Sequence, residues 1–176
     1  MENIIYATGK EGKNVKKNIT KLISLVVTII LGIVAGGVIV GNRCIKKIAK
    51  MKETAAKVHA LYMTYDQWLH IHQEGKTLAD YFTRNGYKTI AIYGMKELGE
   101  RLYDELKDSG VLVSYSIDKN ADAVYAEVDV VRPDEDLEAV DAIVVTAVYY
   151  FDVIEEMLRK KVDYPIISLE DIVYDI

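Results

Sequence analysis

The stretch Lys88-Thr-Ile-Ala-Ile-Tyr-Gly-Met-Lys-Glu-Leu-Gly99 decides the fold of the C-terminal part of this 176-residue chain. Residues 89–93 are apolar or β-branched and predict a buried strand, which ends abruptly at Gly94. A helix is expected over residues 97–109, with leucines four residues apart on the face toward the sheet. The order strand, tight turn, helix is the opening unit of a dinucleotide-binding-like fold.

Further strands and helices follow this unit at regular spacing. Their alternation predicts an α/β fold with a small, doubly wound parallel sheet of about five strands. We expect strands at 111–117, 123–126, 142–147 and 166–169, helices at 78–85, 134–139 and 150–161, and a terminal turn at 170–174. Thr77 with Asp80 is read as the N-terminal cap of the first of these helices, and Gly86 as the residue that ends it.

An uninterrupted apolar run lies near the N-terminus. Residues 22–40 contain no charged side chain, and about 20 helical residues at ~1.5 Å each span the ~30 Å hydrocarbon core of a bilayer. We expect a transmembrane helix over residues 22–41, after a flexible basic tail over residues 1–21. A cleaved signal peptide is the alternative, but the run is longer than such signals, and a basic segment follows it in place of a small-residue cleavage site.

Basic residues lie on both sides of this run, so the positive-inside rule does not orient it. Five lysines precede the run, and five Lys or Arg follow within residues 43–52. A nucleotide-type fold needs cytosolic ligands, and by this fold analogy we expect a single-pass protein of the cell membrane with a cytoplasmic C-terminal domain.

Charge and cysteine content exclude several kinds of partner. Residues 1–76 carry 12 Lys and Arg against 5 Asp and Glu, whereas residues 77–176 carry 10 against 22. Because an acidic domain repels a phosphate backbone, nucleic acid is not expected as a partner. The single cysteine, Cys44, excludes an internal disulfide and a thiolate metal site.

Residues 42–74 contain no Pro or Gly and predict a helical stalk, along which an apolar stripe steps by three and four residues as in a coiled coil. The predicted span holds glycines four residues apart, at 32 and 36 and at 37 and 41, a spacing that favours helix pairing in lipid, although glycine is common in membrane helices generally. Stripe and glycines suggest a homodimer. Alternatively, the stripe packs against the domain of its own chain or a larger membrane partner, and its terminal aromatics favour the domain. The stripe consists of Ile48, Met51, Ala55, Val58, Tyr62, Tyr65, Leu69 and His72.

The turn after the first strand keeps two of the three glycines of the dinucleotide fingerprint Gly-x-Gly-x-x-Gly. Gly94 turns the chain and Gly99 permits close helix packing, but Lys96 occupies the second position, where its side chain would fill the space of a pyrophosphate. Asp118 ends the second strand, near where the ribose-binding acid of such domains falls. A nucleotide pocket for NAD(P) or a nucleotide sugar is one interpretation, and residues that only make the fold are the other. The candidate pocket consists of Gly94, Met95, Lys96, Gly99, Asp118 and Thr146.

The segment from about Tyr65 to Ile176 resembles the Rossmann-like domains that accompany bacterial cell-surface polysaccharide and sugar-nucleotide proteins. It is also similar to the N-terminal domain of sugar acetyltransferases, whose turn usually reads Gly-x-Gly, so Lys96 departs from that pattern. The resemblance implies a Rossmann-like fold and a link to polysaccharide biosynthesis. It is carried by YDQWL (65–69), QEGKTLADYF (73–82), KTIAIYGM (88–95), ELGERLYDEL (97–106), YSIDKN (115–120) and VDAIVVT (140–146).

Two functions follow from these features. The first is a membrane-anchored accessory or scaffold protein with a degenerate Rossmann-like domain over residues 75–176, partnered by glycan-assembly membrane proteins. The alternative is an NAD(P)- or nucleotide-sugar-dependent enzyme acting on sugar precursors. No histidine lies beyond His72, and only 29 residues follow Ala147, too few for a substrate domain. We therefore expect no catalytic residues and favour the accessory role.

Overall fold

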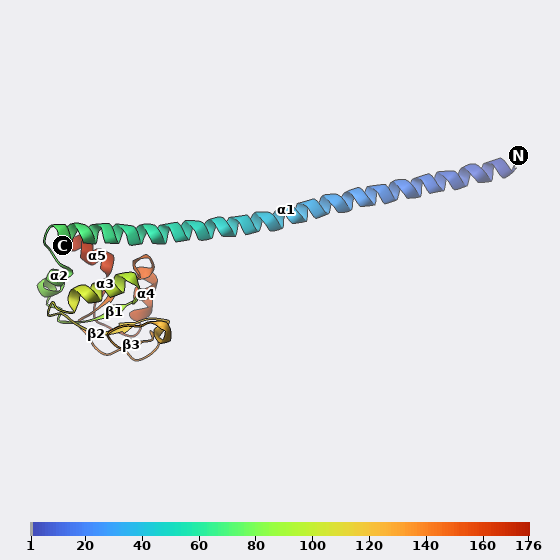
Figure 1. Ribbon diagram of the computed structural model, residues 1–176. Helices are drawn as coiled ribbons and strands as arrows, with labels where there is room; N and C mark the ends of the chain where they lie inside the picture. Colours follow the sequence, from blue (N-terminus) through green and yellow to red (C-terminus); the bar gives the residue numbers. More distant parts are fainter. Residues whose placement is uncertain (1) are drawn as a thin grey trace. The chain divides into compact units, whose positions relative to one another are not determined.

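The computed structural model describes the backbone of residues 2–176 and their side chains, except those of residues 2–15, 18, 34 and 35 (Figure 1). The chain divides into two compact units, Met1–Glu53 and Thr54–Ile176. In chain order the helices and strands are α1 (Glu2–Gln73), α2 (Leu78–Asn85), β1 (Thr89–Tyr93), α3 (Glu97–Leu106), β2 (Leu112–Ile117), η1 (Ala121–Ala123), β3 (Val130–Val131), β4 (Ala142–Val145), η2 (Val148–Tyr150), α4 (Phe151–Leu158), β5 (Ile166–Ser168) and α5 (Leu169–Asp175).

A five-stranded parallel sheet forms the centre of the second unit. The strands pair in the order β3-β2-β1-β4-β5, and every pair is parallel. This is the strand order of a doubly wound α/β sheet. The predicted α/β class and the five parallel strands are therefore confirmed. The order reverses between β1 and β4, so the carboxyl ends of these two strands mark the switch point where such sheets bind ligands.

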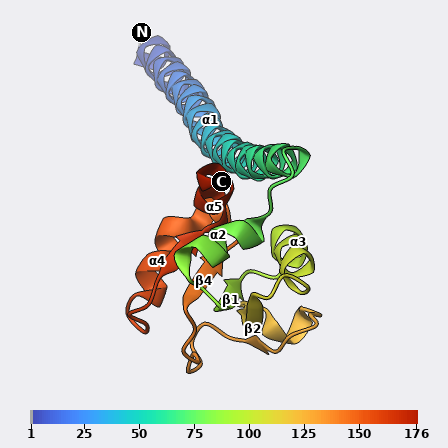
Figure 2. The ribbon, with the colours of Figure 1, turned by 90° about the vertical axis from the view of Figure 1, so that its left-hand side faces the viewer.

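Different helices cover the two faces of the sheet (Figure 2). Ile90 and Ile92 of β1 belong to a core cluster completed by α1, α2, α3 and α5. Ala91 and Tyr93, which alternate with them along the strand, belong to a second cluster with Ile154 of α4. Each strand of the centre is thus buried on both faces, as its continuous apolar sequence predicted.

The first helix and strand of the domain have the predicted bounds. The Asp80 carboxylate accepts hydrogen bonds from the Thr77 amide at 2.9 Å and the Thr77 hydroxyl at 3.0 Å, so Thr77 and Asp80 cap α2 as expected. Gly86 ends α2 in the left-handed conformation with φ of 75°.

The connection between β2 and β4 differs from the prediction. Residues 123–126 form no strand; η1 ends at Ala123 and the edge strand β3 lies further on. Residues 134–139 form no helix. The Glu138 carbonyl accepts hydrogen bonds from the hydroxyls of Tyr115 at 2.7 Å and Tyr164 at 3.1 Å. These two hydroxyls hold the segment in an irregular course across the sheet.

Element ends differ as well. α3 ends at Leu106, three residues earlier than expected, and a helix, α5, replaces the terminal turn because the Ser168 hydroxyl accepts from the Glu170 amide at 3.2 Å. α1 begins at Glu2, whereas we expected a flexible tail over residues 1–21. No proline interrupts these residues, so helix can propagate from the apolar run toward the N-terminus.

The C-terminal end of α1 belongs to the domain. Thr64, Trp68 and Ile71 are buried in its core, so the compact unit starts at Thr54 and not at residue 75 as expected. The face they form is not the predicted stripe. Val58, Tyr62 and Leu69 are 59–61% exposed, so the expectation that the stripe packs on its own domain is wrong at these positions. Tyr65 of the stripe is half-buried against the core cluster and stacks on Trp68, with 6.4 Å between the ring centroids. The expected packing of the terminal aromatics on the domain is therefore confirmed at Tyr65.

α1 is also long and apolar enough to cross a membrane, and it is the single such helix in the described part of the chain. Its apolar window, within Ile19–Gln73, has a mean hydropathy of 2.8 and no buried residue. Length and composition therefore agree with the predicted span.

The first prediction concerns the domain boundary. A fragment of residues 54–176 should melt several degrees higher than a fragment of residues 75–176, because the shorter fragment lacks the buried Trp68 and Ile71 side chains, each worth about 2–5 kcal/mol. Circular dichroism on heating measures this. In the longer fragment, Ile71→Ala should reproduce much of the loss, whereas Leu69→Ala, two residues away and exposed, should not. Equal melting temperatures for the two fragments would contradict the boundary.

Candidate functional site

Five of the six candidate residues lie at the carboxyl ends of adjacent strands, and Gly99 lies in the first turn of the following helix. Gly94, Met95 and Lys96 connect β1 to α3, Asp118 follows β2, and Thr146 follows β4. The fold therefore brings together residues that are up to 52 positions apart in sequence. Their contacts show what this arrangement can do.

Thr146 closes the switch point of the sheet. Its hydroxyl donates to the Gly94 carbonyl at 2.5 Å and lies 3.1 Å from the Tyr93 carbonyl, while its amide donates to the Tyr93 carbonyl at 3.0 Å. A Cβ atom at Gly94 would lie 2.9 Å from this hydroxyl, and the residue has φ of 95°. Gly94 is thus required by conformation and by space, and the hydroxyl of Thr146 bridges the loops that would otherwise flank a ligand.

Gly99 allows the close packing expected of the third glycine. A Cβ atom there would lie 2.1 Å from the Gly94 carbonyl oxygen and 3.4 Å from the Met95 sulfur. The first turn of α3 consequently rests directly on the turn after β1. Met95 is itself buried in the core cluster, so its side chain does not line an open pocket.

The Asp118 carboxylate is occupied by backbone groups of its own domain. It is 8% exposed and accepts from the Asn120 amide at 2.8 Å and, more weakly, from the Met95 amide at 3.4 Å. An acid that binds a ribose must offer its oxygens to the ligand. Here both oxygens already contact amides and join the loops that follow β1 and β2.

The start of α3 is electrostatically unsuited to phosphate. Lys96 is the exposed residue before the helix and makes no side-chain cap, and Glu97 and Glu100 occupy the first turn. Acidic side chains at a helix N-terminus stabilise the helix dipole and repel an anion. The role of Lys96 in nucleotide binding stays a prediction without a supporting contact.

Tyr93 contributes a buried hydroxyl without a hydrogen-bond partner, the one such side-chain atom in the described part of the chain. Burial raises the pKa of this phenol, and the nearby Asp118 charge raises it further. The neutral hydroxyl is therefore maintained at ordinary pH.

Within residues 77–176, two pairs of residues have the spacing Tyr-x-x-x-Lys, in which a lysine can lower the pKa of a catalytic tyrosine. Tyr103 contacts the Glu127 carboxylate at 3.3 Å, and Lys107 donates to Asp104 at 2.9 Å. Burial and Glu127 raise the pKa of Tyr103, and burial raises that of Tyr115, which precedes Lys119 at the same spacing. The Tyr103 hydroxyl bonds to Glu127 and the Tyr115 hydroxyl to the Glu138 carbonyl, so neither contact is the one by which the paired lysine would activate the tyrosine.

An open depression of about 310 Å³ lies elsewhere, beside the ends of β2 and β3 and along α4. Lys161, on its rim, donates to the Glu135 carbonyl at 2.9 Å. None of the six candidate residues lines it, and no group of three or more His, Cys, Asp or Glu among the described residues is placed to hold a metal. It is lined by Lys119, Pro133, Asp134, Met157 and Lys161.

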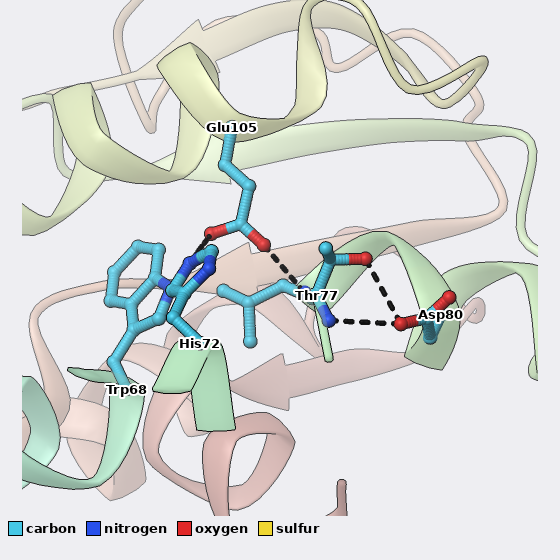
Figure 3. Close-up of polar contacts among 6 residues, drawn as sticks. Trp68, His72, Thr77, Asp80 and Glu105 are labelled. Atoms are coloured by element: carbon cyan, nitrogen blue, oxygen red, sulfur yellow. Dashed lines mark hydrogen bonds and ion pairs between the residues drawn. The ribbon is translucent and has the colours of Figure 1, made fainter. Parts of the chain in front are cut away.

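A polar cluster that the sequence interpretation missed joins α1 to α3 (Figure 3). One Glu105 oxygen accepts from the Trp68 indole at 2.7 Å and lies 2.9 Å from His72 Nε2; the other accepts from the Leu78 amide at 2.6 Å. The Glu105 side chain is only 12% exposed. The sequence places His72 at the end of the stripe and predicts no polar contact for it. The sequence signal for this cluster is the pair of donors formed by the Trp68 indole and the first amide of α2, since both need an acceptor when they are buried.

This cluster gives the second prediction. Glu105→Ala should lower the free energy of unfolding of the detergent-solubilised chain by about 2–4 kcal/mol, because it leaves the Leu78 amide unpaired and leaves the Trp68 indole only its 3.1 Å contact with His72 Nε2. Trp68 is the single tryptophan, so its emission should shift to longer wavelength in the folded variant. Glu100→Gln, an exposed change on the same helix, should alter neither quantity. An unchanged emission spectrum in Glu105→Ala would show that the carboxylate does not hold the indole.

The third prediction concerns Gly99. Gly99→Ala should destabilise the fold by about 1–3 kcal/mol, because the new methyl group overlaps the Gly94 carbonyl. Helix propensity alone would have the opposite sign and stabilise by about 1 kcal/mol. Glu100→Ala, the exposed neighbour, tests the propensity effect separately. Chemical unfolding measures both, and a Gly99→Ala variant as stable as the parent would contradict the close packing.

In the comparisons, the chain matches no protein-family model, no curated protein and no solved structure. The resemblance to sugar-nucleotide proteins therefore stays a prediction, and the proposed function rests on the geometry of the strand ends.

Proposed function

We propose that this chain is a membrane-anchored accessory or scaffold protein, whose degenerate Rossmann-like domain holds a position beside its partners and performs no reaction. The observation that carries the proposal is the 2.5 Å hydrogen bond from Thr146 to the Gly94 carbonyl. It spans the switch point, the place where a doubly wound sheet otherwise receives a nucleotide.

Three further features support a domain without nucleotide chemistry. The Asp118 carboxylate is engaged by amides, acidic side chains surround the start of α3, and Lys96 stands where the fingerprint has a glycine. Each of these removes one contact on which dinucleotide binding depends: the ribose acceptor, the phosphate-binding helix end and the close approach of backbone. An NAD(P)- or nucleotide-sugar-dependent enzyme would need all three.

The Glu105 cluster suits a scaffold. It ties the end of α1 to α3 and α2 by charge-assisted hydrogen bonds. These bonds make the end of α1 part of the domain. The domain also has 22 Asp and Glu against 10 Lys and Arg in residues 77–176, which favours a partner with a basic surface.

Localisation and process complete the proposal. α1 anchors the protein in the cell membrane as a single-pass helix with the domain in the cytoplasm. The resemblance to domains of polysaccharide and sugar-nucleotide proteins indicates glycan-assembly membrane proteins as partners.

Thermal unfolding of the full chain in detergent, with NAD, NADP or UDP-glucose at millimolar concentration, tests the absence of nucleotide binding. We expect no change in melting temperature for the parent or for Lys96→Gly, because Thr146 and Asp118 still close the turn in that variant. A ligand at 100 times its dissociation constant stabilises by about 2.7 kcal/mol, a shift of several degrees. Such a shift with any of the three would overturn the non-catalytic role.

Purification of the tagged chain from membranes tests the assigned process. Co-purifying glycosyltransferases or polysaccharide polymerases, identified by mass spectrometry, support the link to glycan assembly. Their absence, with other membrane proteins recovered instead, would contradict that link and leave the result of the nucleotide test unaffected.

A further inference from the structure

α1 has a second apolar face that its own chain leaves uncovered. Ile48 is 54% exposed, Met51 63%, Val58 60% and Tyr62 61%. Within the domain unit, Thr64, Trp68 and Ile71 form the face that is buried. At 3.6 residues per turn, Tyr62 lies opposite Thr64 and Ile71, and Val58 lies between Tyr62 and the buried face. A helix that needed only to carry the domain would have one apolar face here, not two.

The uncovered face has the period of a helix pair and continues into the predicted span. Its positions step alternately by four and three residues over 25 residues without a break, a repeat of 3.5 that favours a left-handed supercoil of helices. A domain surface or lipid imposes no such repeat. Along the chain the positions are Gly37, Gly41, Cys44, Ile48, Met51, Ala55, Val58 and Tyr62.

Glycines lie on this face and on the one beside it. A Cβ atom built at Gly37 or Gly41 would meet nothing within 4 Å, so a second backbone can approach closely there. The other glycine pair, Gly32 and Gly36, is displaced by one residue from the repeat and lies beside it. Both glycine pairs are open to a second backbone, and only Gly37 and Gly41 continue the apolar repeat.

We propose that this face binds a second copy of the chain, in a parallel, in-register homodimer that runs from Gly37 to Tyr62. The proposal rests on the membrane anchoring assigned above. Two anchored copies have the same orientation and lie at the same depth in the membrane, so the same residues of each stripe face each other. A two-fold axis parallel to the helices relates the two copies and leaves no further copy to bind. Within the domain unit, Trp68 and Ile71 pack in the core, whereas Val58 and Tyr62 stay exposed.

Charge gives the pair a specific signature. Lys47 and Lys52 flank the stripe in the positions that face each other across a parallel dimer, so Lys47 of one copy lies beside Lys52 of the other. This contact is repulsive and weakens the dimer. By the same helical spacing, Arg43, Lys46 and Lys50 lie on the side of the helix opposite to the stripe. A reversal of charge at Lys47 should therefore strengthen the dimer, whereas the same reversal at Lys46 should not.

Cysteine cross-linking of the full chain in its native membranes tests the register. Cys44 lies in the stripe, where facing Cα atoms come within the 4.4–6.8 Å that a disulfide requires. Copper phenanthroline takes two electrons from the two thiols, two protons leave, and a disulfide-linked dimer forms. In a Cys44→Ser background, single cysteines at 48 and 51 should cross-link several-fold more than cysteines at 46 and 50.

Charge variants are then compared in the Cys44 parent. Lys47→Glu should raise the dimer yield several-fold, and Lys46→Glu, with the same net charge, should leave it unchanged. Equal cross-linking around the helix, a maximum at residues 32 and 36, or equal effects of the two charge variants would overturn the proposal. So would a cross-link to a different protein with no dimer of this chain.

Membrane fractionation separates this inference from the proposed function. If the chain is released from membranes by alkaline carbonate, the anchor fails and the dimer with it. If the chain stays in the membrane but shows no periodic cross-linking, only the dimer is overturned.

Discussion

The carboxylate of Glu105 is the contact on which the architecture of the domain depends. Three segments meet at it: the end of α1 through Trp68 and His72, the start of α2 through the Leu78 amide, and α3, which carries it. A buried charge is costly unless each oxygen finds donors, and here both do. The same carboxylate therefore accepts the hydrogen bond of a buried indole, caps the start of α2 and holds the end of α1 against α3.

The strand ends combine the backbone of a dinucleotide-type turn with polar groups that bond to one another. Gly94 and Gly99 still make the tight turn and the close helix contact of a dinucleotide fold. The groups that would meet a ligand have turned inward, since Thr146 bonds to the Gly94 carbonyl and Asp118 accepts from backbone amides. These internal bonds hold the turn and occupy its acceptors, which supports the proposed role without nucleotide chemistry.

α1 has two apolar faces with different surroundings. Its buried face, at Thr64, Trp68 and Ile71, is specific for the domain, and its exposed apolar face follows the heptad repeat of the stalk. Lateral association of membrane-anchored chains through this second face would bring two acidic domains together at one site. A scaffold gains from such pairing because two linked domains hold partners more strongly than one.

Local sequence patterns by themselves determined the α/β class, the central strand, the capped helix α2 and the apolar run of α1. These depend on periodicity, turn residues and caps within a few positions of each other. Only the tertiary structure decided which face of α1 meets the domain, the irregular course of residues 134–139 and the closure of the candidate pocket. Thr146 and Gly94 are 52 residues apart, and Trp68 and Glu105 are 37 apart. No local pattern specifies such contacts, because the same threonine or aspartate in a sequence can bind either a ligand or the backbone of its own chain.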